Sequence, residues 1–294
     1  MKTPKAKPES KPFFPLNLLR SYRKHEPLIL VNGLAEQSYS WFANRGSWHR
    51  HFDLKVPELL VYDGDSLHRH IDGGGEVTVD YLTDRLETFL DEYAQNPPYH
   101  LVGSSLGGQV LLKYASRHPG KVRRLVLIAP SGLHGDENLP VMEGVRRSQY
   151  DMLVKSVFQK AHFATDELVE AIAEKFQDRK WKKGVLRTLR GTVGHSVADL
   201  LDRVKNPTLI IWGANDRIIS DVAGSIRAAD RMAHVRQVVI PKCGHAPQIE
   251  KAGLVNKLVL HFLRDTLRSI PPALEPARLL NPPKRPPFWP AGKP

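Results

Sequence analysis

The sequence has little cysteine and no long apolar run. A single cysteine, Cys243, among 294 residues excludes a disulfide framework within the chain. No apolar stretch approaches the roughly 20 residues that a membrane-spanning helix needs. The basic N-terminus lacks a continuous apolar segment and a small-residue cleavage site, so we expect no secretory signal. These absences lead us to expect a cytoplasmic protein, where a lone thiol stays reduced.

The positive charge of the chain is concentrated at its two ends. The formal net charge is +12 at pH 7, of which residues 1–26 carry +5 and residues 271–294 carry +3. Both ends are rich in proline, which favours extended arms over packed structure. We therefore expect a basic N-terminal arm over 1–26 and a proline-rich tail over 271–294. Solvated arms and weak contact with an anionic surface both remain open, and we expect no specific nucleic-acid partner.

Between the arms, apolar segments typical of strands alternate with segments typical of helices. Helices are predicted over 79–93, with Thr78 as N-cap, from the end of the third strand through Tyr114, and over 254–267. Near-continuous apolar strands separated by helices indicate an α/β fold with a mainly parallel sheet covered on both faces. The predicted strands are 27–32, 58–63, 99–104, 122–130, 207–213 and 235–241.

Residues 133–204 interrupt this alternation with helical patterns only. Helices are predicted over 141–161, 165–177 and 182–194. This stretch is too long for one crossover between neighbouring parallel strands, so it predicts a helical cap inserted into the sheet domain. The α/β core is then expected over 27–132 and 205–270. The excess of basic residues in the cap is typical of a solvated face.

The segment VGSSLGG sets two serines among glycines, between a predicted strand and a predicted helix. Gly103, Ser105 and Gly107 fit the nucleophile elbow G-x-S-x-G, in which the central side chain stands at the tip of a strained turn. The two glycines remove Cβ atoms that would collide as the turn closes. The pattern predicts Ser105 and not Ser104 as nucleophile. Leu106 begins the helix, where its N–H can bind an oxyanion.

A serine nucleophile needs a base, and the base needs an acid that orients it. In a fold built on the elbow, these follow in the order serine, acid, histidine, each after a later strand. Asp216 follows the strand 207–213, and His245 follows the strand 235–241 in a Gly-containing loop. Each alone is more typical of a turn or a surface. Their order and placement together predict a catalytic triad with Ser105.

Two further patterns indicate chemistry less strongly. The segments WHRHFD (48–53) and LHRHID (67–72) each space two histidines as a metal site could. We expect neither a metal nor a cofactor, and the family resemblance given below implies that both segments lie in loops. Cys243 lies two residues before His245. The elbow serine fits a nucleophile better, so this cysteine is expected to be a small buried side chain.

Residues 27–270 resemble the α/β-hydrolase superfamily, in its cap-bearing esterase, lipase and C–C hydrolase branch. The segments VGSSLGG, WGANDRII and CGHAPQIE are similar to that family's nucleophile, acid and histidine segments. The resemblance implies Ser105 as nucleophile, Asp216 as acid and His245 as base. It implies an oxyanion hole formed by the N–H groups of Leu106 and Leu34.

One position departs from the family pattern. The loop after the first strand reads His-Gly in the family, whereas here it reads Asn32-Gly33. Asparagine can form local hydrogen bonds that shape a tight loop, so the oxyanion hole can survive the exchange.

The predicted function is hydrolysis of a small or medium carboxylic ester through an acyl-enzyme, as in a carboxylesterase. One alternative keeps the triad and cleaves a C–C bond of a diketone, a thioester or a peptide end. Another is a ligand receptor or scaffold on a hydrolase fold with little catalysis, which only Asn32 favours. Fold alone does not separate these possibilities.

Overall fold

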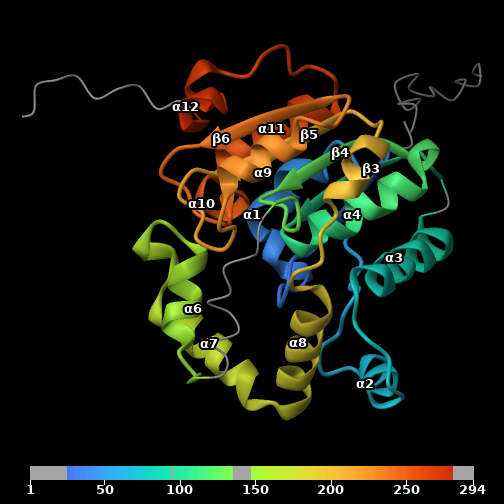
Figure 1. Cartoon of the computed structure of the whole chain (residues 1–294), viewed down its shortest axis with the longest axis vertical. Coiled ribbons are helices and arrows are strands. Elements are labelled where there is room, and N and C mark those ends of the chain that lie inside the picture. Colours follow the sequence, from blue (N-terminus) through green and yellow to red (C-terminus); the bar gives the residue numbers. More distant parts are fainter. Residues whose placement is uncertain (1–24, 95, 135–146, 281–294) are drawn as a thin grey trace, which may run out of the picture.

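The computed structural model describes residues 25–94, 96–134 and 147–280. They form a six-stranded sheet in the order β2-β1-β3-β4-β5-β6 (Figure 1). Every neighbouring pair of strands is parallel. The chain therefore has the predicted α/β fold. The strands are β1 Pro27–Val31, β2 Asp53–Lys55, β3 Tyr99–Ser104, β4 Val122–Ile128, β5 Thr208–Gly213 and β6 Val235–Ile240.

Helices fill most of the connections between the strands (Figure 1). The α-helices are α1 Phe42–Trp48, α2 Asp65–Asp72, α3 Val79–Tyr93, α4 Leu106–Arg117, α6 Tyr150–Val157, α7 Asp166–Gln177, α8 Arg179–Thr192, α9 Val222–Ala229, α10 Pro247–Glu250, α11 Ala252–Leu263 and α12 Ala277–Leu280. The 3-10 helices are η1 Ser38–Trp41, η2 Pro119–Lys121, η3 Ala161–Phe163, η4 Ala198–Arg203 and η5 Pro272–Leu274.

The central strands bury both faces, and their side chains alternate between two apolar cores. Leu28 and Leu30 of β1 lie in the core shared with α1 and α11. Ile29 and Val31 lie in the core shared with α3, α4 and α9. Because successive residues of a strand point to opposite faces, an unbroken apolar run is what a sheet covered on both sides requires.

The predicted strand over 58–63 is wrong. The second strand, β2, covers Asp53–Lys55 and pairs with the edge of β1. Residues 58–63 form a loop that lines a cavity of about 160 Å³, so their apolar side chains pack without a strand partner. Tyr62 accounts for part of the apolar pattern over 58–63, because its side chain is buried in the loop and its hydroxyl accepts a hydrogen bond from the N–H of Ala35.

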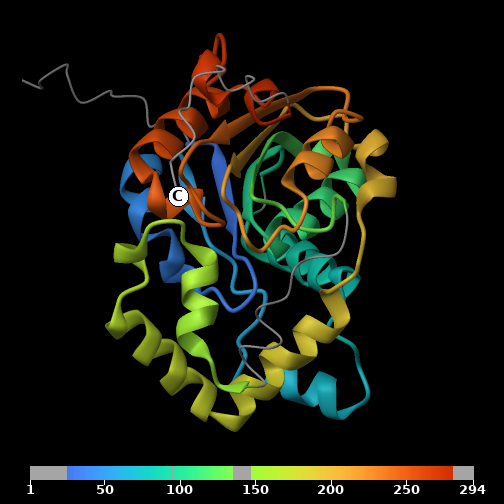
Figure 2. The ribbon, with the colours of Figure 1, turned by 60° about the vertical axis from the view of Figure 1, so that its left-hand side comes forward.

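Residues 133–204 enter the sheet domain between β4 and β5, and we name them the helical insertion. Its described part contains helices and loops only, with α6, η3, α7, α8 and η4. Figures 1 and 2 show α6, α7 and α8 as a group set apart from the sheet. The ring of Phe176 stacks on Tyr150 and meets Trp181 edge-on, and these rings join the larger core that also contains Tyr62. Part of the predicted helix over 141–161 lies outside the described residues, and α6 begins at Tyr150.

The described residues extend the folded domain at both ends of the predicted core. Glu26 accepts a backbone hydrogen bond from Asp53 and pairs with His100, so it belongs to the domain rather than to the N-terminal arm. Leu274 is buried among the residues that pack on α11. The boundary predicted at residue 271 is therefore too early. In the part of the chain that the structure describes, no helix has the length and apolar character to cross a membrane.

Candidate active site

Ser105 lies at the junction between β3 and α4, in a backbone conformation that a serine rarely adopts. Its φ is 49° and its ψ is −118°, and its N–H donates to the carbonyl of Ile128 at 2.9 Å. Its own carbonyl accepts from the N–H of Gly108 at 2.8 Å. Strain of this kind persists only where the surroundings fix it. The neighbouring strand and the first helical turn fix Ser105 here.

The glycines of the elbow allow its backbone to approach other segments closely. A Cβ on Gly107 would lie 2.4 Å from the carbonyl oxygen of Val31. A Cβ on Gly103 would lie 2.8 Å from the backbone of Gly107. Both contacts are with backbone, which cannot move aside as a flexible side chain can. The elbow therefore packs directly against β1 and the loop that follows it.

The structure brings Asp216 and His245 together, although 29 residues separate them. Nδ1 of His245 lies 2.8 Å from Oδ2 of Asp216. The other carboxylate oxygen, Oδ1, accepts from the N–H groups of Ile218 at 2.8 Å and Ile219 at 3.0 Å. The Asp216 side chain is fully buried. A carboxylate fixed in this way holds the imidazole with Nδ1 as donor, which makes Nε2 the basic nitrogen.

The loop that carries His245 is held by the helical insertion. The N–H of His245 donates to the carbonyl of Val157 at 2.8 Å. The buried carboxylate of Glu250 accepts from Gly244 at 2.6 Å and from Lys160 at 3.1 Å. It also accepts from the N–H of Gln159. The end of α6 and the histidine loop are thus joined through backbone groups.

The loop after β1 is fixed by three side chains. Oδ1 of Asn32, which stands where the family has histidine, accepts from Nε1 of Trp41 at 2.6 Å. The N–H of Gly33 donates to Oε2 of Glu36 at 2.9 Å. Ala35, with a φ of 58°, donates its N–H to the hydroxyl of Tyr62 at 2.9 Å. Asn32 therefore contributes a structural hydrogen bond to the loop that contains Leu34.

Ser104 has buried polar partners and is distinct from Ser105. It is 1% exposed, and its hydroxyl donates to Oε1 of Glu36 at 3.3 Å. Nε2 of Gln248, in α10, donates to the same hydroxyl at 3.1 Å. Ser104 thus connects the end of β3 to the loop after β1 and to α10.

Sequence reasoning did not identify Glu36, Gln248 or Glu250 as part of this region. Each acts through hydrogen bonds to backbone or to a neighbouring side chain, and such bonds have no characteristic spacing in a sequence. One signal was available for Glu36, which stands three residues after Gly33 in an otherwise neutral loop. A buried carboxyl group needs hydrogen-bond partners, and this one has the N–H of Gly33 and the hydroxyl of Ser104.

The paired histidines contribute to structure elsewhere. The prediction that 67–72 forms a loop is wrong, because Asp65–Asp72 is helix α2. The ring of His68 is hydrogen-bonded to the carbonyl of Tyr62, and the ring of His70 stacks on Tyr81. Across the described residues, no group of three or more His, Cys, Asp or Glu side chains is arranged to hold a metal ion.

Comparisons with known proteins identify the family and the fold. A family model described as "Alpha/beta hydrolase family" matches residues 28–258. Human monoacylglycerol lipase ABHD6 is 24% identical over 260 residues, covering 81% of this chain and 76% of the lipase. A 2-hydroxy-6-oxo-6-phenylhexa-2,4-dienoate hydrolase from Comamonas testosteroni is 27% identical over 184 residues, covering 56% of this chain and 62% of that protein.

Among solved structures, a bacterial membrane phospholipase A superimposes with a TM-score of 0.70. Its sequence is 21% identical, and the superposition covers 84% of this chain and 81% of that one. At this level of sequence identity, the superposition supports a shared fold only.

Proposed function

The chain belongs to the alpha/beta hydrolase family, and we propose that it is a serine hydrolase that cleaves a small or medium carboxylic ester through an acyl-enzyme. The observation that carries the proposal is Ser105 in its strained elbow, followed along the chain by the hydrogen-bonded pair Asp216 and His245. A purely structural turn requires neither the strain nor a buried carboxylate on a histidine.

In the first step, Oγ of Ser105 attacks the ester carbonyl while Nε2 of His245 takes the hydroxyl proton. The tetrahedral oxyanion is stabilised by the N–H groups of Leu106 and Leu34. As the carbonyl re-forms, the alcohol leaves with the proton from His245, and the acyl group stays on Ser105. Water then repeats the sequence and releases the acid. Asp216 keeps the imidazole oriented and stabilises its charged form.

Leu106 suits the role of an oxyanion donor, because it is the first residue of α4. The first four N–H groups of a helix have no acceptor within the helix, and the helix dipole adds partial positive charge there. Leu34 follows Gly33 in the loop that Trp41, Glu36 and Tyr62 hold in place. The helical insertion between β4 and β5 is proposed to act as a cap that selects the substrate.

A panel of esters tests the proposed function. p-Nitrophenyl esters of graded chain length should be hydrolysed with a kcat that depends on the triad, and a monoacylglycerol belongs in the panel because of the similarity to monoacylglycerol lipase. A folded protein that hydrolyses none of them would contradict ester hydrolysis.

The second candidate is hydrolysis of a C–C bond next to a ketone. The observation in its favour is the similarity to the dienoate hydrolase from Comamonas testosteroni. A vinylogous diketone should be assayed beside the esters, with loss of its absorbance as the readout. If kcat/KM for the diketone is well above that of every ester, C–C bond hydrolysis becomes the favoured function and ester hydrolysis the second candidate.

A further inference from the structure

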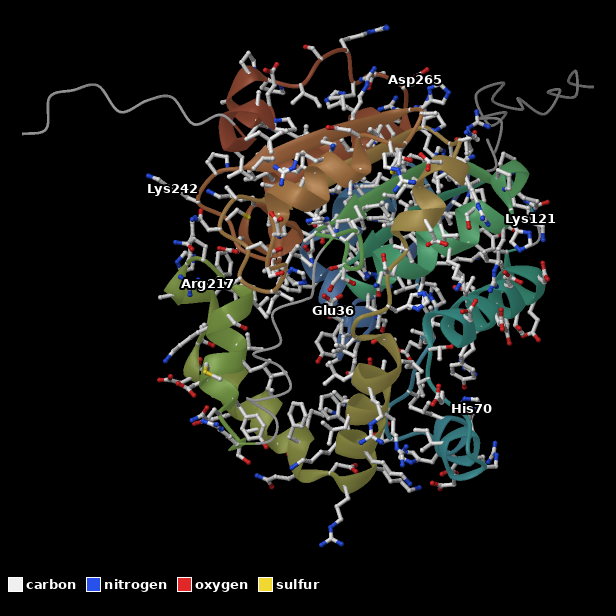
Figure 3. The ribbon with its side chains drawn as sticks, viewed as in Figure 1. Glu36, His70, Lys121, Arg217, Lys242 and Asp265 are labelled. Carbon is white, nitrogen blue, oxygen red and sulfur yellow. The ribbon has the colours of Figure 1, made fainter. Side chains whose placement is uncertain are left out.

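Glu36 is a carboxyl group inside the catalytic region to which the proposed mechanism assigns no role. An ideal Cβ built on Gly33 would lie 3.0 Å from Oε1 of Glu36 and 3.2 Å from Cβ of Ser105. The carboxyl group and the nucleophilic serine therefore flank the same small space beside Gly33. Figure 3 labels Glu36 near the middle of the molecule, whereas His70, Lys121 and Asp265 lie at its outside.

The two oxygens of this carboxyl group bind different segments of the protein. Oε2 accepts from the N–H of Gly33, in the loop after β1. Oε1 accepts from the hydroxyl of Ser104, the last residue of β3. Leu34 immediately follows the first partner, and Leu106 lies two residues after the second. The proposed oxyanion donors thus sit on two segments that Glu36 joins.

We propose that Glu36 is a positioning residue that fixes the separation of the two oxyanion-hole segments, and that it does so as an ionised carboxylate bridging Gly33 and Ser104. The inference rests on the proposed serine hydrolase function. Oxyanion donors stabilise a transition state only when they are held at hydrogen-bond distance from the developing charge. A bridge between their segments therefore affects the chemical step more than substrate binding.

Protonation of Glu36 would weaken the bridge, because a protonated carboxyl has lost acceptor capacity and carries a hydrogen of its own. The net effect of the surroundings is a raised pKa for Glu36: burial, the largest cause, raises it, and the hydrogen bond from Gly33, the nearby charge of His245 and the hydrogen bond from Ser104 lower it by less. The other titratable groups that face it are Tyr62 and, across the cavity that Glu36 lines, Glu58 and Asp63.

The acidic side of the pH profile should therefore depend on Glu36. In the wild type, falling pH protonates both His245 and Glu36, and each event reduces kcat/KM. In Glu36→Gln only the protonation of His245 still reduces kcat/KM. The variant also lacks the negative charge of Glu36, which favours the protonated form of His245. The acid limb of log kcat/KM should then become shallower and move to lower pH. A Glu36 that acted on His245 only through its charge would shift this limb without changing its slope.

The experiment measures ester kinetics for Glu36→Gln, Glu36→Ala, Ser104→Ala and the double variant Glu36→Ala/Ser104→Ala. The matched control is Glu58→Gln, which alters an exposed carboxyl group of the same cavity wall. Glu36→Ala should lower kcat about 10- to 100-fold, with KM changed only a few-fold. Ser104→Ala should lower kcat less, and the double variant should match Glu36→Ala, because both remove one bridge. The control should behave as wild type.

A transition-state analogue gives a second readout. The affinity for a trifluoromethyl ketone should fall in Glu36→Ala by the same factor as kcat/KM. Wild-type kcat in Glu36→Ala, or losses from the two single variants that multiply in the double variant, would overturn the bridge while leaving the serine hydrolase function intact. If Glu36→Ala does not fold, the pH profile of Glu36→Gln and the kcat of Ser104→Ala decide the question. A folded wild type that hydrolyses no substrate would overturn both proposals together.

Discussion

At the scale of single residues, Cys243 lies two residues before His245, the proposed catalytic base, and its thiol is shielded from solvent. It is fully buried, and burial raises the pKa of its thiol to about 12. Because the thiolate is the reactive form, this thiol is a poor nucleophile at neutral pH. Its side chain packs instead in the core formed with α11.

We predict that iodoacetamide does not modify Cys243 in the native protein at pH 8 and modifies it fully in denaturant. Peptide mass spectrometry measures both, and ester hydrolysis by the treated native protein should be unchanged. Alkylation of the native protein that removes activity would return Cys243 to consideration as a nucleophile.

Sequence reasoning predicted the residues whose chemistry imposes a pattern. The elbow needs glycine on both sides of Ser105, and the triad order follows from strands that end at one edge of a sheet. Glu250 was not predicted because its partners are backbone N–H groups, which nearly every residue type supplies, and Glu36 was not predicted because one partner is a backbone N–H and the other is a hydroxyl 68 positions away. The carboxyl of Glu250 binds Gln159 and Lys160, about 90 positions earlier in the chain, and no local pattern indicates such a contact.

At the scale of elements, the helical insertion and the histidine loop are connected by Glu250. Its carboxylate accepts hydrogen bonds from backbone N–H groups of both segments. The carbonyl of Val157, at the end of α6, also accepts a hydrogen bond from the N–H of His245. A shift of α6 would therefore move the backbone of His245. We infer that docking of the insertion helps to place His245, the proposed catalytic base.

We predict that Glu250→Ala lowers stability and activity together. It leaves buried N–H groups without an acceptor, at a cost of about 1–3 kcal/mol each, which urea unfolding measures. Displacement of His245 should also slow ester hydrolysis about 10-fold or more under conditions where the variant remains folded. Glu174→Ala, on an exposed face of α7, is the control and should leave both unchanged. Full activity in folded Glu250→Ala would show that the base is placed without this contact.

Two phenylalanines of the insertion have different surroundings. Phe158 stacks with Phe163 and packs against Ala246, the neighbour of His245. Phe176 lies between Tyr150 and Trp181, in the large core that the insertion shares with the sheet domain. We predict that Phe158→Ala changes the preference for acyl chain length while a small acetyl ester is still hydrolysed. Phe176→Ala should lower stability by about 3–5 kcal/mol without changing that preference. A changed chain-length preference in Phe176→Ala, together with an unchanged preference in Phe158→Ala, would contradict this account of the cap.

The elements themselves were largely predictable. Strands buried on both faces and amphipathic helices such as α3, where Thr78 accepts the N–H of Tyr81, have strong patterns. The error over 58–63 arose because an apolar loop beside a cavity has the same composition as a short strand. Periodicity cannot separate the two, since the deciding factor is whether a partner strand is present.

At the scale of the whole molecule, we predict that catalytic activity depends on the folded domain and not on the charged ends of the chain. The arms carry most of the net charge. The domain extends to Leu274, so a useful truncation keeps residues 25–280. We predict that this shortened protein keeps kcat/KM on a soluble ester within a few-fold of the full chain. A large loss of activity in a folded truncated protein would show that an arm contributes to the site.

The same pair of proteins tests contact of the arms with an anionic surface. The full chain should bind vesicles rich in anionic lipid at low salt and dissociate as salt screens the charge. Equal binding by the shortened protein would exclude the arms as the cause.

The most direct test of the central claim is the site of reaction with a fluorophosphonate probe, determined by peptide mass spectrometry. The probe should label Ser105 and not Ser104, and labelling should disappear in Ser105→Ala. In His245→Ala and Ser105→Ala, kcat on an ester should fall by about 10³- to 10⁶-fold, and the double variant should lose little more, because the triad acts as a unit. Labelling at Ser104 or Cys243, or a folded wild type that is neither labelled nor active, would contradict the account.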